Sequence, residues 1–239
     1  MKKVLFLLTF FISVNLVAQD RYFTIYNFSV ENKDVETVAK IVNDYFAMPG
    51  TKAEGVTAYL YENHFKDKDF NFSHSLSFVG TLDAMGNQYS PTGGVNQEKF
   101  QAFLTKINQF TTGHSSASGR RLITFGSTNK TYPVQNQNML KVKDATKFAA
   151  AFKKYQEVLK AENVVTTLGE IKNGRSPLGE THYVLRSYPN FKAALLGTGT
   201  EIPTDKTKLD AYNAFYNETM NAGIVEIVRS TTRLLLGEW

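Results

Sequence analysis

The sequence predicts an α+β protein in which one unit of strands and helices occurs twice along the chain. The first reason is that residues 34–45 and 144–155, which lie 110 positions apart, share one pattern. Each segment begins with aspartate, continues with apolar residues and alanine at helical spacing, and ends with tyrosine. The second reason is that strand-like and helix-like segments surround both in the same order. Together these observations predict two βαββαβ units in a single chain.

The first unit is expected over residues 21–126. Residues 21–30 are rich in aromatic and β-branched side chains, which is typical of a strand. A helix begins near Asn32 or Asp34, either of which can cap it, and Pro49 with Gly50 ends it. Further strands are expected at residues 55–65, 70–82 and 120–126, and a second helix at residues 97–110. The polar, glycine-containing residues 86–96 and 111–119 are expected to be loops.

The second unit is expected over residues 138–239, after a polar connector at residues 127–137 that has no periodicity. Its strands are expected at residues 138–142, 163–171, 181–188 and 230–239, and its helices at residues 144–160 and 206–220. Residues 189–204 are longer than the corresponding loop of the first unit. We expect them to hold an extra short helix at residues 190–196.

Matched residues elsewhere support a duplication. They keep a nearly constant offset through the second, third and fourth strands of the two units. The pairs are Glu62 with Glu170 and His74 with His182, each 108 positions apart, and Arg121 with Arg233, 112 positions apart. Two such matches could arise by chance, but an ordered series through every element indicates that one unit was duplicated.

A βαββαβ unit is a ferredoxin-like fold, a four-stranded antiparallel sheet with two helices on one face. The strands here carry more apolar side chains than one helical layer can cover, so the open faces of the two sheets are expected to pack together. In this order and duplication the chain resembles the dimeric α/β-barrel superfamily, in which two such units form a barrel with helices outside. The resemblance covers residues 21–239 and implies the fold far more than an activity.

The N-terminus has the layout of a secretory signal peptide. In residues 1–18, Lys2 and Lys3 precede an apolar run that ends in Ala18; a membrane anchor is the alternative, although the run is shorter than a spanning helix usually needs. No other stretch is long enough to span a membrane. The chain has no cysteine, which excludes disulfides, thiolate metal sites and a cysteine nucleophile. We therefore expect a periplasmic or secreted bacterial protein.

Charge argues against a nucleic-acid partner. Without Lys2 and Lys3 the chain has 25 basic and 22 acidic residues, which gives a net charge of +3. The basic residues are scattered along the chain. The four histidines have no metal-ligand spacing. We expect no metal and no cofactor. Nothing in the sequence favours a monomer over a homo-oligomer.

The resemblance implies several activities, because the superfamily includes cofactor-independent monooxygenases, isomerases, haem enzymes and proteins of no known activity. A haem relative would need an axial histidine in the second unit, where His182 is the only one and lies on a predicted strand. Since no catalytic constellation is visible, we expect a protein that binds a small apolar or aromatic molecule between its sheets. A cofactor-independent monooxygenase or isomerase is one alternative, and a structural or interaction protein with a filled core is another.

Seven residues are candidates for the ligand site, because their side chains can transfer protons or hold an anion. They are His74, His182, Arg121, Arg186, Arg233, Glu62 and Glu170. The alternative roles are structural: histidines hydrogen-bonded at strand ends, and ion pairs between adjacent strands. Alternation places His74 beside Leu76 and Phe78, so the histidines face either the shared space or the helices.

Overall fold

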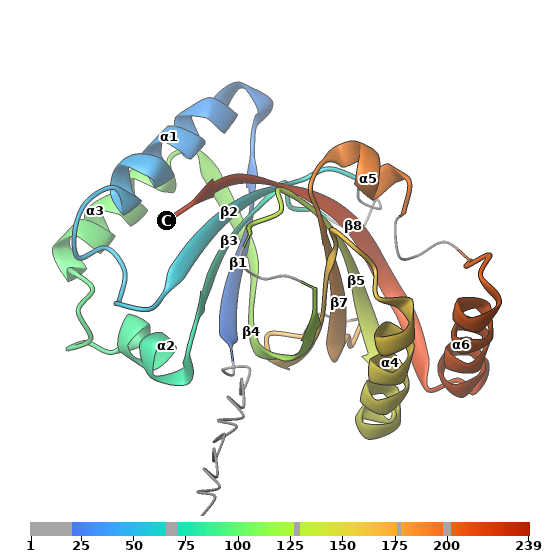
Figure 1. Ribbon diagram of the computed structural model, residues 1–239. Helices are drawn as coiled ribbons and strands as arrows, with labels where there is room; N and C mark the ends of the chain where they lie inside the picture. The colour runs from blue at the N-terminus through green and yellow to red at the C-terminus, as the bar shows by residue number, and fades with distance from the viewer. Residues whose placement is uncertain (1–20, 66–70, 127–129, 176–177, 198–201) are drawn as a thin grey trace, which may run out of the picture.

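A closed antiparallel barrel with helices on its outer surface forms the body of the protein (Figure 1). The computed structural model describes residues 21–65, 71–126, 130–175, 178–197 and 202–239. The expected signal peptide lies outside these residues. Within them, no helix is both long and apolar enough to cross a membrane.

The two units contain the same elements in the same order. The first consists of β1 (Tyr22–Val30), α1 (Val35–Phe46), β2 (Thr57–Asn63), β3 (His74–Gly80), α2 (Leu82–Tyr89), α3 (Gln97–Ile107) and β4 (Thr111–Phe125). The second consists of β5 (Val134–Val142), α4 (Ala145–Leu159), β6 (Val165–Asn173), β7 (His182–Tyr188), α5 (Phe191–Leu195), α6 (Lys206–Tyr216) and β8 (Val225–Glu238). A 3-10 turn (Asn32–Asp34) precedes α1, and a π-helical turn (Asn217–Asn221) follows α6.

The last strand of each unit joins the two units. The strand order around the barrel is β1-β3-β2-β8-β5-β7-β6-β4, and every pairing is antiparallel. Strand β4 pairs with β1 of its own unit and with β6 of the other. Strand β8 pairs with β5 and, in the same way, with β2. The predicted α+β barrel of two ferredoxin-like repeats is therefore confirmed, with the sheets joined at their edges.

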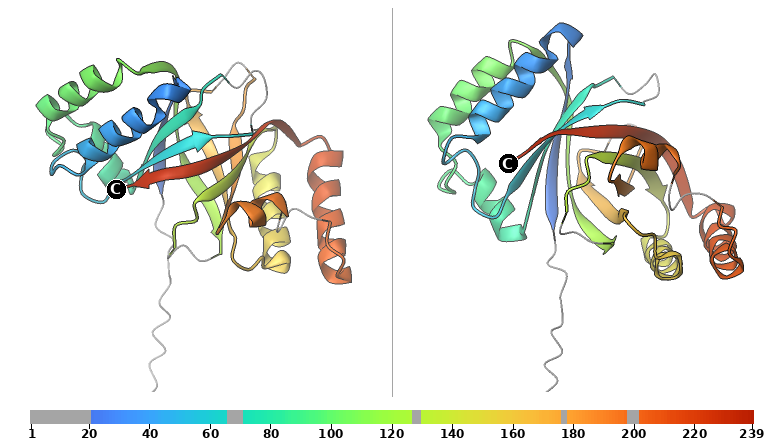
Figure 2. Two further views of the ribbon diagram at one scale, coloured as in Figure 1. Left: turned by 90° about the horizontal axis from the view of Figure 1, so that it is seen from above. Right: turned by 45° about the horizontal axis from the view of Figure 1, so that its top comes forward.

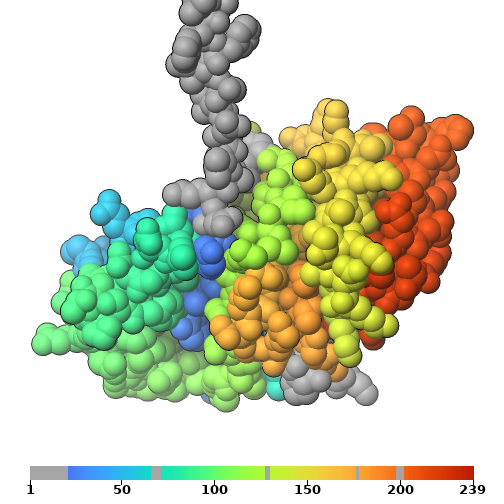
Figure 3. Space-filling view, turned by 90° about the horizontal axis from the view of Figure 1, so that it is seen from below, coloured from blue at the N-terminus to red at the C-terminus, as the bar shows by residue number. Residues whose placement is uncertain are grey.

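The hydrophobic core lies between the barrel and its helices, in separate layers on opposite sides (Figure 2). In the first unit, Val42 of α1 belongs to a cluster with Leu60 and Phe78 of the sheet. In the second, Phe152 of α4 packs in the same way with Leu168. The space-filling view shows the two units side by side (Figure 3). Trp239, which follows β8 of the second unit, contacts the first unit, because its ring stacks on Phe46 of α1 with 5.2 Å between ring centroids.

Several boundaries differ from those that the sequence predicts. The expected loop at residues 111–119 is the first half of β4, because pairing with β1 imposes an extended conformation on its polar residues. Helix α2 occupies part of the region expected to be a loop, so the short helix in residues 189–204 has a counterpart in the first unit. Strand β5 begins at Val134, inside the expected connector, and β8 begins at Val225.

The two aspartates that mark the repeat differ in their contacts. Asp144 caps α4, because its Oδ1 accepts a hydrogen bond of 3.0 Å from the backbone N–H of Lys147. Asp34 precedes α1 without a side-chain capping bond, and Asn32 lies in the 3-10 turn before it. The expected cap by either residue on α1 is therefore wrong, because the chain enters α1 through the 3-10 turn.

This difference predicts unequal effects of one substitution. Replacing a capping aspartate with alanine typically costs about 1 kcal/mol of stability. We expect Asp144→Ala to lower the free energy of unfolding by about that amount and Asp34→Ala to lower it by clearly less, as measured by urea denaturation. Equal losses in the two variants would contradict the assignment of the cap to Asp144 alone.

Candidate ligand-binding cavity

The barrel encloses a cavity of about 710 Å³, to which all eight strands contribute side chains. Because side chains alternate along a strand, every second residue of β3 points inward, and these are Ser75, Ser77 and Val79. Exposed lining residues, among them His114, Arg175 and Leu178, mark the mouth of the cavity. The buried part contains the aromatic side chains of Tyr61 and Tyr183.

Arg233 is the most deeply buried cation of the cavity wall. Its side chain projects from β8, and only 6% of the residue is exposed. The guanidinium lies 4.0 Å from the ring centroid of Tyr61, and its Nε donates a hydrogen bond of 2.8 Å to Oε1 of Gln135 on the adjacent β5. Burial lowers the pKa of Arg233 below its usual value, because removal of water disfavours the charged form. Both of these partners are neutral.

Arg121 projects from β4 and also lines the cavity. Strand register makes it the equivalent of Leu235 and not of Arg233, because Arg121 pairs with Gly169 and Leu235 with Tyr61. Its charge acts on Arg233, whose pKa it lowers further after the larger effect of burial. Burial raises the pKa of Tyr183 to about 12, with Arg121 and Arg233 opposing that rise. Burial likewise raises the pKa of Tyr61. The two phenols therefore stay protonated at neutral pH and can donate hydrogen bonds.

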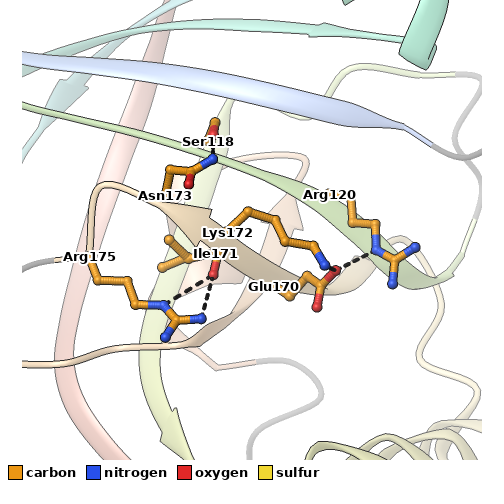
Figure 4. Close-up of polar contacts among 7 residues, drawn as sticks. All are labelled: Ser118, Arg120, Glu170, Ile171, Lys172, Asn173 and Arg175. Carbon is orange, nitrogen blue, oxygen red and sulfur yellow. Dashed lines mark hydrogen bonds and ion pairs between the residues drawn. The ribbon is translucent and has the colours of Figure 1, made fainter.

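A second pair of charges lies nearer the mouth, where Arg229 NH2 and Glu180 Oε1 are 2.7 Å apart and both side chains are largely buried. Arg175 donates from Nε and NH2 to the backbone carbonyl of Ile171 over 3.3 Å each (Figure 4). Among the described residues that line the cavity, four arginines accompany one glutamate. That glutamate is paired with Arg229, so the cavity carries an excess of positive charge.

The wall beside Tyr183 depends on a glycine. Gly169 pairs with Tyr183 across β6 and β7, and a Cβ on Gly169 would lie 2.2 Å from Tyr183 Cζ. The equivalent pair of the first unit is Tyr61 with Ser75. The large and small residues have thus exchanged strands between the two units. Tyr183 also contacts Phe23 edge to face, with 5.4 Å between ring centroids.

This arrangement predicts a clash that can be relieved. We expect Gly169→Ala to lower the free energy of unfolding by roughly 1–3 kcal/mol, because overpacking forces the Tyr183 ring to move. In the double variant Gly169→Ala/Tyr183→Ser the alanine should cost little relative to Tyr183→Ser alone. Denaturant unfolding of the four proteins in this cycle measures the coupling, and additive losses would contradict the contact.

The structure brings two of the seven candidate residues, Arg121 and Arg233, to the cavity. The expectation that His74 and His182 share a cavity wall is corrected, because both lie on the helix-covered face of the sheet. His74 stacks on Phe28, with 5.9 Å between ring centroids, and Phe28 belongs to the core beneath α1. His182 alternates with the cavity-lining Tyr183. Each imidazole Nδ1 is within hydrogen-bond distance of the preceding hydroxyl, at 2.8 Å for His74 and 2.9 Å for His182.

The other three candidates also lie outside the cavity lining. Glu170 forms ion pairs with Arg120 of the neighbouring strand β4 and with Lys172 of its own strand (Figure 4). Burial opposes ionisation of Glu170, but the combined hydrogen bonds and charges of these two cations lower its pKa. Glu62 lies 3.3 Å from His64. Arg186 shares its strand face with His182, where burial lowers its pKa.

The sequence analysis did not identify Tyr61, Tyr183, Gln135, Arg229, Glu180, Arg175 or His114. Most have no matching residue type at the equivalent position: Glu180 corresponds to Phe72 and Arg229 to Ser115, both of which line the cavity. A search for matched pairs therefore passes over them. The pattern that contains them is the alternation of inward-facing residues, which needs strand register and direction.

The position of His182 gives stability a pH dependence. Burial lowers its pKa below the ordinary value of 6.5, an effect that Glu170 opposes and Arg175 reinforces. The folded state therefore binds this proton less readily than the unfolded state, so its contribution to stability is present above pH 6.5 and is lost as the pH falls through the folded-state pKa. We expect the melting temperature to fall less between about pH 7.5 and about pH 5.5 in His182→Gln than in the wild type. An identical fall in both would contradict this.

The described lining of the cavity contains few side chains that could ligate a metal ion or a haem. Over the part of the chain that the structure describes, no three histidine, aspartate or glutamate side chains are grouped to hold a metal ion. A haem in the cavity could not use His182 as its axial ligand, because that imidazole lies on the other face of the sheet. His114, at the mouth, is the one imidazole among the described lining residues.

Comparison with known proteins identifies the fold. No protein-family model matches the chain, and no curated protein matches it. Among solved structures, a candidate monooxygenase from Fusobacterium nucleatum aligns with a TM-score of 0.57 and 15% identity over 91% of this chain and 93% of its own. A candidate monooxygenase from Lactobacillus acidophilus gives 0.56 and 16% over 91% and 95%, and an anthrone oxidase-like protein gives 0.54 and 10% over 92% and 93%. The chain thus has the dimeric α/β-barrel fold.

Proposed function

We propose that this protein binds a small aromatic molecule inside its barrel. The observation that carries the proposal is the cavity of about 710 Å³, which falls within the range of about 300–1,000 Å³ that is usual for ligand sites. A structural protein with a filled core, one of the alternatives from sequence, does not fit this volume.

The chemistry of the wall favours an aromatic ligand. Rings of Phe23, Tyr59, Tyr61, Phe72 and Tyr183 offer faces and edges for stacking. Ser77, Gln135 and Gln137 are among the polar lining residues that can form hydrogen bonds with such a ligand. Aromatic walls bury the body of a ligand, and polar groups between them fix its orientation.

An enzyme that needs no cofactor, a monooxygenase or isomerase, is the second candidate. His114 favours it, because this imidazole lines the mouth, and its Nε2 lies 2.7 Å from Oγ of Ser29. A histidine in that position can accept a proton from a bound substrate. Candidate monooxygenases and an anthrone oxidase-like protein are among the similar structures, which supports oxidation of an aromatic compound.

Export is part of the proposal. It is supported by the basic and apolar layout of residues 1–18 and by the absence of cysteine. A protein exported in this way would meet its ligand outside the cytoplasm.

The proposal predicts that the purified protein carries or accepts an aromatic ligand. We expect native mass spectrometry of the full chain expressed in bacteria to show a polypeptide beginning at Gln19 together with a bound small molecule. Added naphthalene-2-carboxamide should raise the melting temperature in proportion to the logarithm of its excess concentration. A product heavier than the released ligand by one oxygen atom would identify a monooxygenase.

A matched pair of variants locates the binding. Ser77→Trp places an indole inside the cavity and should abolish the shift in melting temperature, whereas Lys172→Trp introduces the same indole on the outer surface and should preserve it. If no small molecule is bound and the carboxamide leaves the melting temperature unchanged, the proposed function is wrong.

A further inference from the structure

We propose that the ligand is an aromatic carboxylate and that Arg121 and Arg233 bind its carboxylate group. This inference rests on the proposed function, because it assigns chemistry to a molecule in the same cavity. It goes beyond that function by naming the charge of the ligand and the residues that recognise it.

The first argument is the environment of Arg233. A buried guanidinium normally has a carboxylate partner, because burial of an unpaired charge is unfavourable. Arg233 is buried, yet its partners among the described residues are the neutral amide of Gln135 and the face of the Tyr61 ring. Its hydrogen bond to Gln135 uses Nε, so the two terminal nitrogens remain to bind an oxyanion.

The second argument is the presence of another cation at the same place. Arg121 comes from the last strand of the first unit and Arg233 from the last strand of the second, and both side chains line the shared cavity. Two like charges in one cavity repel each other, and the charge of Arg121 disfavours protonation of Arg233. One anion placed between them would convert this repulsion into two attractive contacts.

The third argument comes from the same cavity. Arg229 has its own counter-charge, because Glu180 lies 2.7 Å from it. Among the described lining residues there is no second carboxylate to play that part for Arg121 and Arg233. The tyrosines do not supply one either, because burial keeps the phenols of Tyr61 and Tyr183 protonated.

The shape of the group follows from its partners. Arginine donates two parallel N–H groups that match the planar fork of a carboxylate, and charge-assisted hydrogen bonds of this type are among the stronger ones in proteins. The phenolic hydroxyls of Tyr61 and Tyr183 can donate to the same oxygens. The nearby rings of Phe23 and Tyr59 suit an aromatic body attached directly to that group.

The test compares two probes that differ only in charge. Naphthalene-2-carboxylate and naphthalene-2-carboxamide share one ring system, and isothermal titration calorimetry measures the affinity of each for the mature protein. We expect the carboxylate to bind at least about tenfold more tightly, the effect of a charge-assisted contact. This preference should disappear in Arg121→Met and in Arg233→Met.

A control variant separates the site from general charge. Arg120 is the neighbour of Arg121 on β4, but its side chain forms an ion pair with Glu170 outside the cavity lining. Arg120→Met removes the same net charge and should keep the preference for the carboxylate. Phosphorylated naphthol, tested alongside, should bind more weakly than the carboxylate; tighter binding would assign the arginines to a phosphate instead.

A stability measurement distinguishes ligand binding from a structural role. If Arg121 and Arg233 are held in place for a ligand, Arg121→Met should leave the melting temperature of the ligand-free protein unchanged or raise it, because it removes repulsion. A structural role predicts a fall. If Arg233→Met does not fold, Arg121→Met alone still tests whether the preference for the carboxylate is lost.

The outcomes separate the two proposals. If the carboxamide and the carboxylate bind equally well, or if the preference survives in Arg121→Met, the anion inference is overturned while the proposed aromatic ligand stands. If neither probe binds and no molecule is bound on purification, the proposed function falls together with the inference.

Discussion

Closure of the barrel by β4 and β8 is the constraint on which the rest of the structure depends. A single βαββαβ unit leaves exposed strand edges, whose unpaired backbone groups favour association with another chain. Here the last strand of each unit is long enough, 15 residues in β4 and 14 in β8, to pair with its own unit and with the other. Duplication within one chain thus satisfies the edges internally. It also forces the inner faces of the two sheets to surround a common space.

Because the barrel is closed, its outer face packs the core and its inner face is left for ligand binding. The helices cover the outer face of the barrel, so the large apolar side chains pack there, as Leu60 and Leu168 do at 1% and 0% exposure. The inner face does not have to supply the core and carries serine, glutamine, tyrosine and arginine in its place. A substitution on the inner face therefore changes the ligand site more than the outer packing, except where an inner residue contacts a neighbouring strand, as Tyr183 does at Gly169.

How far the sequence predicts this molecule depends on which property is encoded locally. Element order and duplication can be recognised from local sequence. They predict the barrel, because two similar units with unpaired sheet edges can pair those edges with each other. The direction of a strand face is not local: His74 next to Leu76 and Phe78 indicates the helix side, but the repeat match with His182 argued for the shared space with equal force. The repeat match did select Arg121 and Arg233, which line the cavity, and Glu62 and Glu170, which do not. Register decides between these cases, and it is set by pairing between strands far apart in the chain.

Sequence divergence between the two units makes the charge of the cavity wall asymmetric. Of its charged lining residues, Arg175, Glu180, Arg229 and Arg233 come from the second unit, and the first contributes Arg121. At the positions equivalent to Glu180, Arg229 and Gln135 the first unit has Phe72, Ser115 and Phe23, none of which is charged. A pseudo-symmetric barrel would accept a molecule in two orientations related by its axis. Because most of the charged lining residues belong to the second unit, a ligand with a ring and a charged end has only one favourable orientation. A substrate held in one orientation is what stereospecific or position-specific chemistry requires.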